Sequence, residues 1–309
     1  MRLSLFDLHC DTALRMLSYE KPLYDNPFAV SLAKADQYER YVQVMALFTP
    51  HALTDEDGWE NMLRTWENLR ADASVKSKQA QIRINFSADS DTSTSLLLSV
   101  EDARILNCDI DRVDQLYQMG IRIITPLWRG VTCIGGAHDT DVGLSEFGKS
   151  AMQRAIALGM IPDISHASEK SSEVLFDLAK QASRPVIASH SNAYALCPVS
   201  RNLRDRQIKQ IIDSNGLIGI NLYTHFLRED GNASIVDVLR HIEYFLEKDA
   251  RSALCLGCDM DGAELPTELS DVSKLPYIAE ALLKRNYPEN LIHAIFFENA
   301  YQFAIKNFI

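Results

Sequence analysis

The chain has 309 residues, a formal net charge of −11 and 47% hydrophobic residues, with charged residues at 24%. This balance is typical of a globular protein and excludes a largely disordered one. The acidic charge disfavours nucleic acid and anionic membrane surfaces as partners. No apolar stretch of the sequence approaches the ~20 residues that a membrane-spanning helix needs, so we expect no membrane partner.

The cysteines and the first residues favour a cytoplasmic protein. Six cysteines are scattered along a long chain, which argues against a disulfide framework. The opening MRLSLFDLHCD has too short an apolar run for a secretory signal. Cys255 and Cys258 have the C-x-x-C spacing of redox and zinc sites, but they lie in an apolar run without a second pair. We therefore expect them to have a structural role.

Eight short apolar runs rich in β-forming residues predict strands. In chain order they are 3–8, 42–48, 95–100, 121–125, 160–164, 186–189, 217–222 and 253–256. Helical patterns fall between most of these runs. Residues 54–79 repeat apolar side chains at helical spacing, and Thr54 and Asp57 resemble a capping pair. Other helices are predicted at 146–158 and 235–247, after caps at Ser168 and Asp205, and as a tail of two or three helices at 274–309.

The alternation of strands and helices predicts a parallel sheet. Eight strands that are apolar on both faces favour a closed barrel, because helices outside and side chains inside bury both faces. We predict a single (β/α)8 TIM barrel domain over residues 1–309, with extra C-terminal helices. An open doubly wound sheet is the alternative, but no G-x-G-x-x-G motif follows the first strand.

Polar side chains with metal-ligand chemistry follow five of the predicted strands. A TIM barrel gathers these strand ends at one face, where its active site lies. Any one of these residues alone would more often be a helix cap or a turn residue, so their coincidence at one face carries the prediction. They are His9 and Asp11 after the first strand, Glu101 after the third, His166 after the fifth, His190 after the sixth, and Asp259 with Asp261 after the eighth.

Three imidazoles with several carboxylates suit zinc or a similar divalent ion. Glu101 could bridge two ions through its two oxygens, which makes a two-metal site possible. Such a pair lowers the pKa of water and polarises carbonyl groups. The residue types therefore predict a metal-dependent hydrolase.

Longer motifs surround these residues and carry a family resemblance. They are 7–12 (DLHCDT), 100–102 (VED), 159–168 (GMIPDISHAS), 185–193 (PVIASHSNA), 201–203 (RNL), 216–221 (GLIGIN) and 257–262 (GCDMDG). In these motifs, and in order over essentially the whole chain, the sequence resembles the membrane (renal) dipeptidase family of zinc peptidases, within the amidohydrolase-like barrels.

The resemblance implies two zinc ions (Zn2+) per subunit. His9, Asp11 and Asp259 would hold one ion, His166 and His190 would hold the other, and Glu101 would bridge both. A hydroxide between the ions would attack the peptide carbonyl of a small dipeptide. Asp259 would accept its proton and pass it to the leaving amine, so Asp259 and Glu101 are the expected catalytic residues.

The resemblance also implies a substrate site. Arg201 would hold the terminal carboxylate of the dipeptide through its planar guanidinium group. Asn221 and Tyr223 would line the pocket. Family enzymes cleave dipeptides, often with a D-residue at the C-terminal position, and are often dimers, so a homodimer is expected. We expect neither a signal nor a lipid-anchor segment, in contrast to the mammalian membrane-bound members.

One segment departs from the family pattern. Where mammalian members carry a substrate-contacting histidine after the fourth strand, this chain has Trp128. Either Trp128 or His138 could take the place of that histidine. The departure leaves open a related two-metal hydrolase acting on another small amide or a lactone. An inactive metal-binding receptor is a third possibility, against which the complete ligand set argues.

Overall fold

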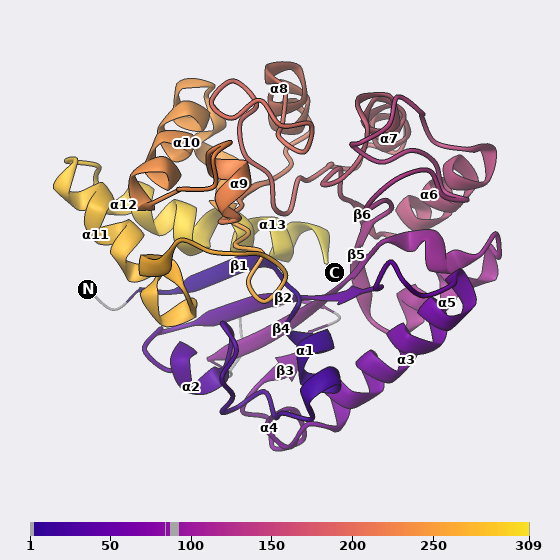
Figure 1. Ribbon diagram of the computed structural model, residues 1–309, viewed down its shortest axis with the longest axis horizontal. Helices are drawn as coiled ribbons and strands as arrows, with labels where there is room; N and C mark the ends of the chain where they lie inside the picture. The colour runs from indigo at the N-terminus through magenta and orange to yellow at the C-terminus, as the bar shows by residue number, and fades with distance from the viewer. Residues whose placement is uncertain (1–2, 84, 87–92, 309) are drawn as a thin grey trace.

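The computed structural model describes residues 3–83, 85–86 and 93–308. At its centre lies a parallel sheet with the strand order β6-β5-β4-β2-β1-β8-β7, in which β3 also pairs with β4 (Figure 1). The strands are β1 (Leu5–Cys10), β2 (Tyr41–Phe48), β3 (Gln81–Ile82), β4 (Thr94–Glu101), β5 (Ile121–Thr125), β6 (Ile161–Pro162), β7 (Ile218–Ile220) and β8 (Leu254–Leu256).

The sheet closes between β6 and β7 through residues 186–189. Single parallel bridges join Asp163 to Ile187 and Ala188 to Ile218, so the segment predicted as the sixth strand connects the two edges. The backbone N–H of Ile187 donates to Pro162 O at 3.1 Å, and that of Ala188 donates to Leu217 O at 2.8 Å. The curled sheet confirms the predicted TIM-barrel fold and excludes the open doubly wound sheet.

Most strand bounds are close to the prediction, and β1 differs in a way that matters for the site. β1 continues to Cys10 rather than ending at residue 8, so His9 lies on the strand itself. The short strand β3 was not predicted, because two residues make no apolar run. β3 pairs with the start of β4, at Ser95 and Leu96, before β5 begins to pair at Leu98.

The barrel interior has its own apolar cluster. The strands β1, β2, β4, β5, β6 and β8 each supply at least one side chain to it, from Phe6 on β1 to Cys255 on β8, and Ile187 and Leu217 add to it from outside the named strands. Side chains of the C-terminal helices, including Phe297 and Tyr301, complete this cluster, and the ring centroids of Phe6 and Phe297 lie 6.4 Å apart. The tail therefore closes the N-terminal end of the barrel and leaves the C-terminal end as the mouth.

Helices surround the barrel (Figure 1). The described α-helices are α1 (Thr12–Tyr19), α2 (Leu32–Ala35), α3 (Asp55–Ala71), α4 (Ala73–Lys76), α5 (Asp111–Gln118), α6 (Glu146–Leu158), α7 (Glu169–Gln181), α8 (Asp205–Asp213), α9 (Thr224–Leu227), α10 (Ile235–Glu247), α11 (Pro276–Lys284), α12 (Glu289–His293) and α13 (Asn299–Asn307). Short helical turns are η1 (Ala103–Leu106), η2 (Ala250–Ser252), η3 (Thr267–Leu269), η4 (Val272–Lys274) and η5 (Ala294–Glu298).

The helices α6 and α10 confirm their predicted bounds, and Ser168 caps α7 as expected. Two predictions were wrong in detail. The helix predicted at 54–79 breaks at Asp72, whose side chain accepts a hydrogen bond from Ser74 N at 2.9 Å and starts α4. Asp205 is the first residue of α8, and Arg204 occupies the cap position. The extra C-terminal helices are present as α11, α12 and α13, while Ile309 lies outside the described residues.

Two further expectations concern cysteines and membranes. All six cysteines are free, and burial raises the pKa of the Cys255 and Cys258 thiols well above the usual value. Buried neutral thiols agree with the structural role expected for this pair. None of the helices in the described part of the chain has the length and apolar character that a bilayer crossing requires.

Candidate metal centre and active site

The six side chains predicted as metal ligands converge at the C-terminal mouth of the barrel. His9 on β1 and His166 after β6 contact opposite oxygens of Glu101, at the end of β4. His9 Nε2 lies 3.1 Å from Glu101 Oε2, and His166 Nε2 lies 3.0 Å from Glu101 Oε1. His190 Nε2 lies 3.6 Å from Glu101 Oε1. The carboxylate of Glu101 therefore lies between three imidazole groups.

Two triplets in the described residues have the geometry of a metal-binding group. Within each triplet, the three ligand atoms lie within 4.8 Å of one another. The triplets are His9 with Glu101 and His190, and His9 with Asp11 and Asp259. His166 adjoins the first triplet, because its Nε2 lies 3.0 Å from His190 Nε2. Two imidazole nitrogens this close, both facing one carboxylate, suit a shared cation.

Unpartnered buried atoms support a cation in this place. Asp11 Oδ1 is buried and makes no hydrogen bond in the described residues, and buried His9 Nε2 lies close to Glu101 Oε2 without the geometry of a hydrogen bond. A buried polar atom without a partner costs free energy that a bound metal ion would offset. The residues present therefore fit the metal centre that the ligand chemistry predicts.

The electrostatics of the cluster agree with that fit. Burial lowers the pKa of His190 well below its usual value, and burial together with the charge of Arg201 lowers the pKa of His166. Both imidazoles are thus neutral at pH 7, the form that binds metals. Burial and the neighbouring Glu101 carboxylate raise the pKa of Asp11 to about 7. A cation would stabilise the ionised form of this carboxylate.

The ring of His166 is oriented by the backbone of the β5 loop. His166 Nδ1 lies 3.0 Å from the carbonyl oxygen of Trp128, which can only accept a hydrogen bond. The proton of His166 is therefore on Nδ1, and the lone pair of Nε2 faces Glu101. His166 has a φ of +69° and Asp259 has a φ of +60°, conformations that are costly for residues with a side chain.

The ring of His190 is oriented by two residues that do not face the cavity. Ser189 Oγ lies 2.7 Å from His190 Nδ1 and donates to Asp163 Oδ2 at 2.5 Å. Asp163 is fully buried and also accepts hydrogen bonds from Thr125 Oγ1 and from the backbone N–H of Ser165. This chain of contacts fixes the orientation of the imidazole from behind.

Asp259 is positioned in a similar way. Asn221 Nδ2 donates to Asp259 Oδ2 at 3.0 Å and to His190 O at 3.2 Å. The preceding residue, Cys258, donates its backbone N–H to Asp7 Oδ1 at 2.8 Å. A buried residue of β1 and one directly after β7 therefore set the position of the β8 loop that carries Asp259.

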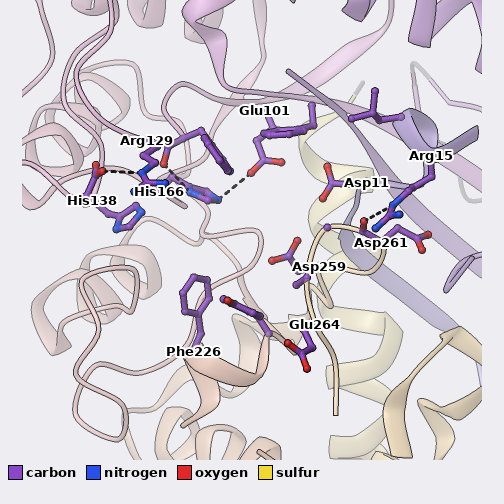
Figure 2. Close-up of a pocket in the computed structure, with 17 residues that line it drawn as sticks. Asp11, Arg15, Glu101, Arg129, His138, His166, Phe226, Asp259, Asp261 and Glu264 are labelled. Carbon is purple, nitrogen blue, oxygen red and sulfur yellow. Dashed lines mark hydrogen bonds and ion pairs between the residues drawn. The ribbon is translucent and has the colours of Figure 1, made fainter. Parts of the chain in front are cut away.

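Four of the six candidate ligands, Asp11, Glu101, His166 and Asp259, line a cavity of about 730 Å³ (Figure 2). This volume is within the range of small-molecule sites. The cavity is lined by Asp11, Leu14, Arg15, Phe48, Glu101, Trp128, Arg129, His138, Asp139, His166, Tyr223, Phe226, Asp259, Asp261, Gly262, Ala263 and Glu264.

Three of the predicted substrate residues line this cavity and two do not. Trp128, His138 and Tyr223 belong to the lining. Asn221 is fully buried behind it and contacts Asp259, so its place differs from the predicted one. Arg201 is also buried, with its Cζ 5.6 Å from the ring centroid of the lining residue Phe226.

Arg201 nevertheless keeps one unsatisfied donor. Its terminal nitrogens donate to Ser191 Oγ at 2.8 Å and to His190 O at 3.0 Å, while its Nε has no partner in the described residues. Burial lowers the pKa of Arg201 to about 10, so the guanidinium group stays charged at pH 7. Burial and the charge of Arg201 lower the pKa of His138 to about 4, so His138 is neutral at pH 7.

Several residues of the site were not predicted from the sequence. Arg15, Phe48 and Glu264 line the cavity without belonging to a recognisable motif. Asp163 and Ser189 belong to the motifs that carry His166 and His190. Their positions at strand ends, close to these histidines, could have identified them.

The family model "Membrane dipeptidase (Peptidase family M19)" matches residues 1–305. The chain belongs to the membrane dipeptidase family, M19. As a member of this family it is a metallodipeptidase, and the His and Glu groups described above are its candidate metal-binding residues. The resemblance inferred from the sequence motifs is confirmed.

Individual relatives agree with this assignment. A metallopeptidase from Rhodobacter sphaeroides, solved with a phosphinate mimic of the dipeptide L-Ala-D-Ala, superposes with a TM-score of 0.91 at 25% identity over 100% of both chains. An uncharacterised protein in the pqqA 5′ region of Klebsiella pneumoniae is 36% identical over 59% of this chain and 71% of its own length. An uncharacterised dipeptidase of Schizosaccharomyces pombe is 31% identical over 63% of this chain and 49% of its own.

Proposed function

We propose that the protein hydrolyses small dipeptides, with an L-residue first and an L- or D-residue second, using two zinc ions. The convergence of His9, Glu101 and His190 at one point carries this proposal. His9, Asp11 and Asp259 would hold one ion, His166 and His190 would hold the other, and Glu101 would bridge them. Zinc would supply Lewis-acid polarisation of the scissile carbonyl and of water.

The protein side chains would do the remaining work. Asp259 Oδ2, which accepts a hydrogen bond from Asn221, would take a proton from the attacking water and deliver it to the leaving amine. Arg201, which is buried next to the ring of Phe226, would bind the substrate carboxylate. Trp128 or His138, both in the lining, would face the oxygen of the scissile carbonyl. The phosphinate mimic in the bacterial relative favours a dipeptide that can end in a D-residue.

A dipeptide panel tests the proposal. The purified protein should contain two zinc ions per chain and should cleave L-Ala-L-Ala or L-Ala-D-Ala. A chelator should abolish this activity, and zinc should restore it. Hydrolysis of a lactone or a non-peptide amide, but of no dipeptide, would contradict the proposal and favour the alternative that Trp128 leaves open. A homodimer and a cytoplasmic location stay predictions.

A further inference from the structure

Arg15 brings an unneutralised positive charge to the cavity. It lies on α1, four residues after the candidate ligand Asp11, and belongs to the cavity lining. Among the residues that the structure describes, no carboxylate lies within ion-pair distance of Arg15. The other arginine of the lining, Arg129, differs in this respect, because its Nε lies 3.5 Å from Asp139 Oδ2.

The guanidinium group of Arg15 is anchored at one atom. Arg15 Nε donates to the carbonyl oxygen of Asp261 at 3.1 Å. Asp261 is itself fixed, because its carboxylate accepts hydrogen bonds from Thr12 Oγ1 at 2.5 Å and from Ala29 N at 2.8 Å. The anchored Nε leaves the two terminal nitrogens of Arg15 available for a ligand, in the planar arrangement that matches a carboxylate.

The place of Arg15 indicates which part of a dipeptide it would meet. Figure 2 shows Arg15 and His138 on opposite sides of the carboxylates of Glu101, Asp11 and Asp259. Arg201 lies on the His138 side, because His138 Nδ1 lies 2.9 Å from Oγ of Ser200, the residue that precedes Arg201. A dipeptide whose carboxylate faces Arg201, with its peptide bond at the ligand cluster, therefore directs its N-terminal residue toward Arg15.

Other residues of the lining are compatible with such a residue. Leu14, which precedes Arg15 on α1, offers apolar contact for a short aliphatic stem. Glu264 lies in another part of the lining, below Asp259 in Figure 2; it is exposed and has no cation partner among the described residues, so its carboxylate suits the α-ammonium group of a substrate. A residue with an ammonium group and a side-chain carboxylate complements both charges.

We propose that Arg15 forms a subsite selecting dipeptides whose N-terminal residue is aspartate or glutamate. The proposal rests on the dipeptidase function proposed above and names its substrate class. An exposed arginine is often only solvated, and a solvated role predicts no difference between acidic and neutral substrates. A charge-assisted hydrogen bond to a substrate carboxylate predicts a preference of about tenfold or more.

The experiment compares Glu-Ala with its neutral isostere Gln-Ala on the zinc-loaded enzyme. We expect a kcat/KM at least about tenfold higher for Glu-Ala than for Gln-Ala, and we expect Arg15→Gln to bring the ratio of the two values close to one. Arg15→Lys should restore part of the preference. Arg129→Gln is the matched control, because Arg129 already pairs with Asp139, and it should keep the preference.

Binding gives a second readout that does not depend on turnover. Phosphinate mimics of Glu-Ala and Gln-Ala, titrated by calorimetry, should differ in Kd by a similar factor in the wild type and not in Arg15→Gln. Equal wild-type values for the two compounds, or an equal loss for both in Arg15→Gln, would overturn the subsite. Absence of any dipeptide hydrolysis would instead reject the proposed function, and the binding ratio would still decide the role of Arg15.

Discussion

Ser189 lies 2.7 Å from His190 Nδ1, on the side of the imidazole that faces away from Glu101. Its hydroxyl donates to the buried carboxylate of Asp163, so the lone pair of Ser189 can accept the His190 proton. This arrangement leaves Nε2 of His190 as the metal-binding atom. Partners of this kind keep ligand rings in the metal-binding tautomer and orientation.

Removing this hydroxyl should weaken metal binding without unfolding the barrel. We expect Ser189→Ala to lower zinc affinity by about 10- to 100-fold, measured by competition with a chromophoric chelator. Ser189→Thr keeps a hydroxyl and should restore part of the affinity. Ser99→Ala is the control, because the Ser99 hydroxyl is buried on β4 and has no partner in the described residues. Wild-type zinc affinity in Ser189→Ala would contradict this role.

Loss of His166 or His190 should reduce the number of zinc ions that the centre binds. We expect His166→Ala and His190→Ala to bind fewer zinc ions per chain than the wild type and to lose about 100-fold or more in kcat/KM, because each change removes a ligand rather than its support. Elemental analysis with dipeptide hydrolysis measures both effects. Full two-metal occupancy in both variants would exclude these residues as ligands.

A substitution at Gly262 would displace two candidate ligands without replacing either of them. A Cβ at this position would lie 1.9 Å from Asp11 Oδ2 and 2.8 Å from Asp259 Oδ1. Gly262→Ala should therefore displace both carboxylates and reduce the zinc content found by elemental analysis. Gly143→Ala is the matched control, because its Cβ would meet its nearest neighbour at an ordinary 3.6 Å. Equal zinc content in the two variants would argue against Asp11 and Asp259 as ligands.

Arg201 should act on the substrate carboxylate. We expect Arg201→Ala to lower kcat/KM for a free dipeptide by about 10- to 100-fold, mainly by raising KM, because a charge-assisted hydrogen bond is lost. The corresponding dipeptide amide lacks this carboxylate and should be cleaved at nearly the same rate by variant and wild type. An equal loss for both substrates would indicate that the buried side chain is needed only for packing.

His241 should make stability depend on pH. Its Nδ1 accepts the backbone N–H of Ala193 at 3.1 Å, its Nε2 lies 3.1 Å from Leu227 O, and burial lowers its pKa to about 4. The unfolded chain binds the extra proton below about pH 6.5, so His241 stabilises the fold above that pH. This contribution, on the order of 2–3 kcal/mol, is lost as the pH falls toward 4.

Denaturant unfolding between pH 4 and 7 measures this dependence. His241→Gln should unfold more easily at pH 7 and should show a smaller change in the free energy of unfolding across that range. A variant with the same pH dependence as the wild type would assign the effect to other groups.

The sequence predicted the barrel and the proximity of the six candidate ligands, because both rest on local patterns, while their role as ligands stays a prediction. Apolar runs mark strands, and the mouth of a barrel collects whatever follows them, so Glu101 and His190 could be placed together without a structure. Asn221 could not be placed correctly, since the turn that sends it behind the lining depends on contacts with His190 and Asp259. Arg15 was missed because its role depends on a distant carbonyl group, that of Asp261.

Single bridges at Ile187 and Ala188 close the barrel between β6 and β7. The same short segment carries His190 only two residues further on. Occupation of the metal centre would therefore stabilise a part of the barrel wall that is held by few strand-pairing contacts. The amide protons of Ile187 and Ala188 thus become natural reporters of metal loading, with slow deuterium uptake in the loaded enzyme and faster uptake after chelation.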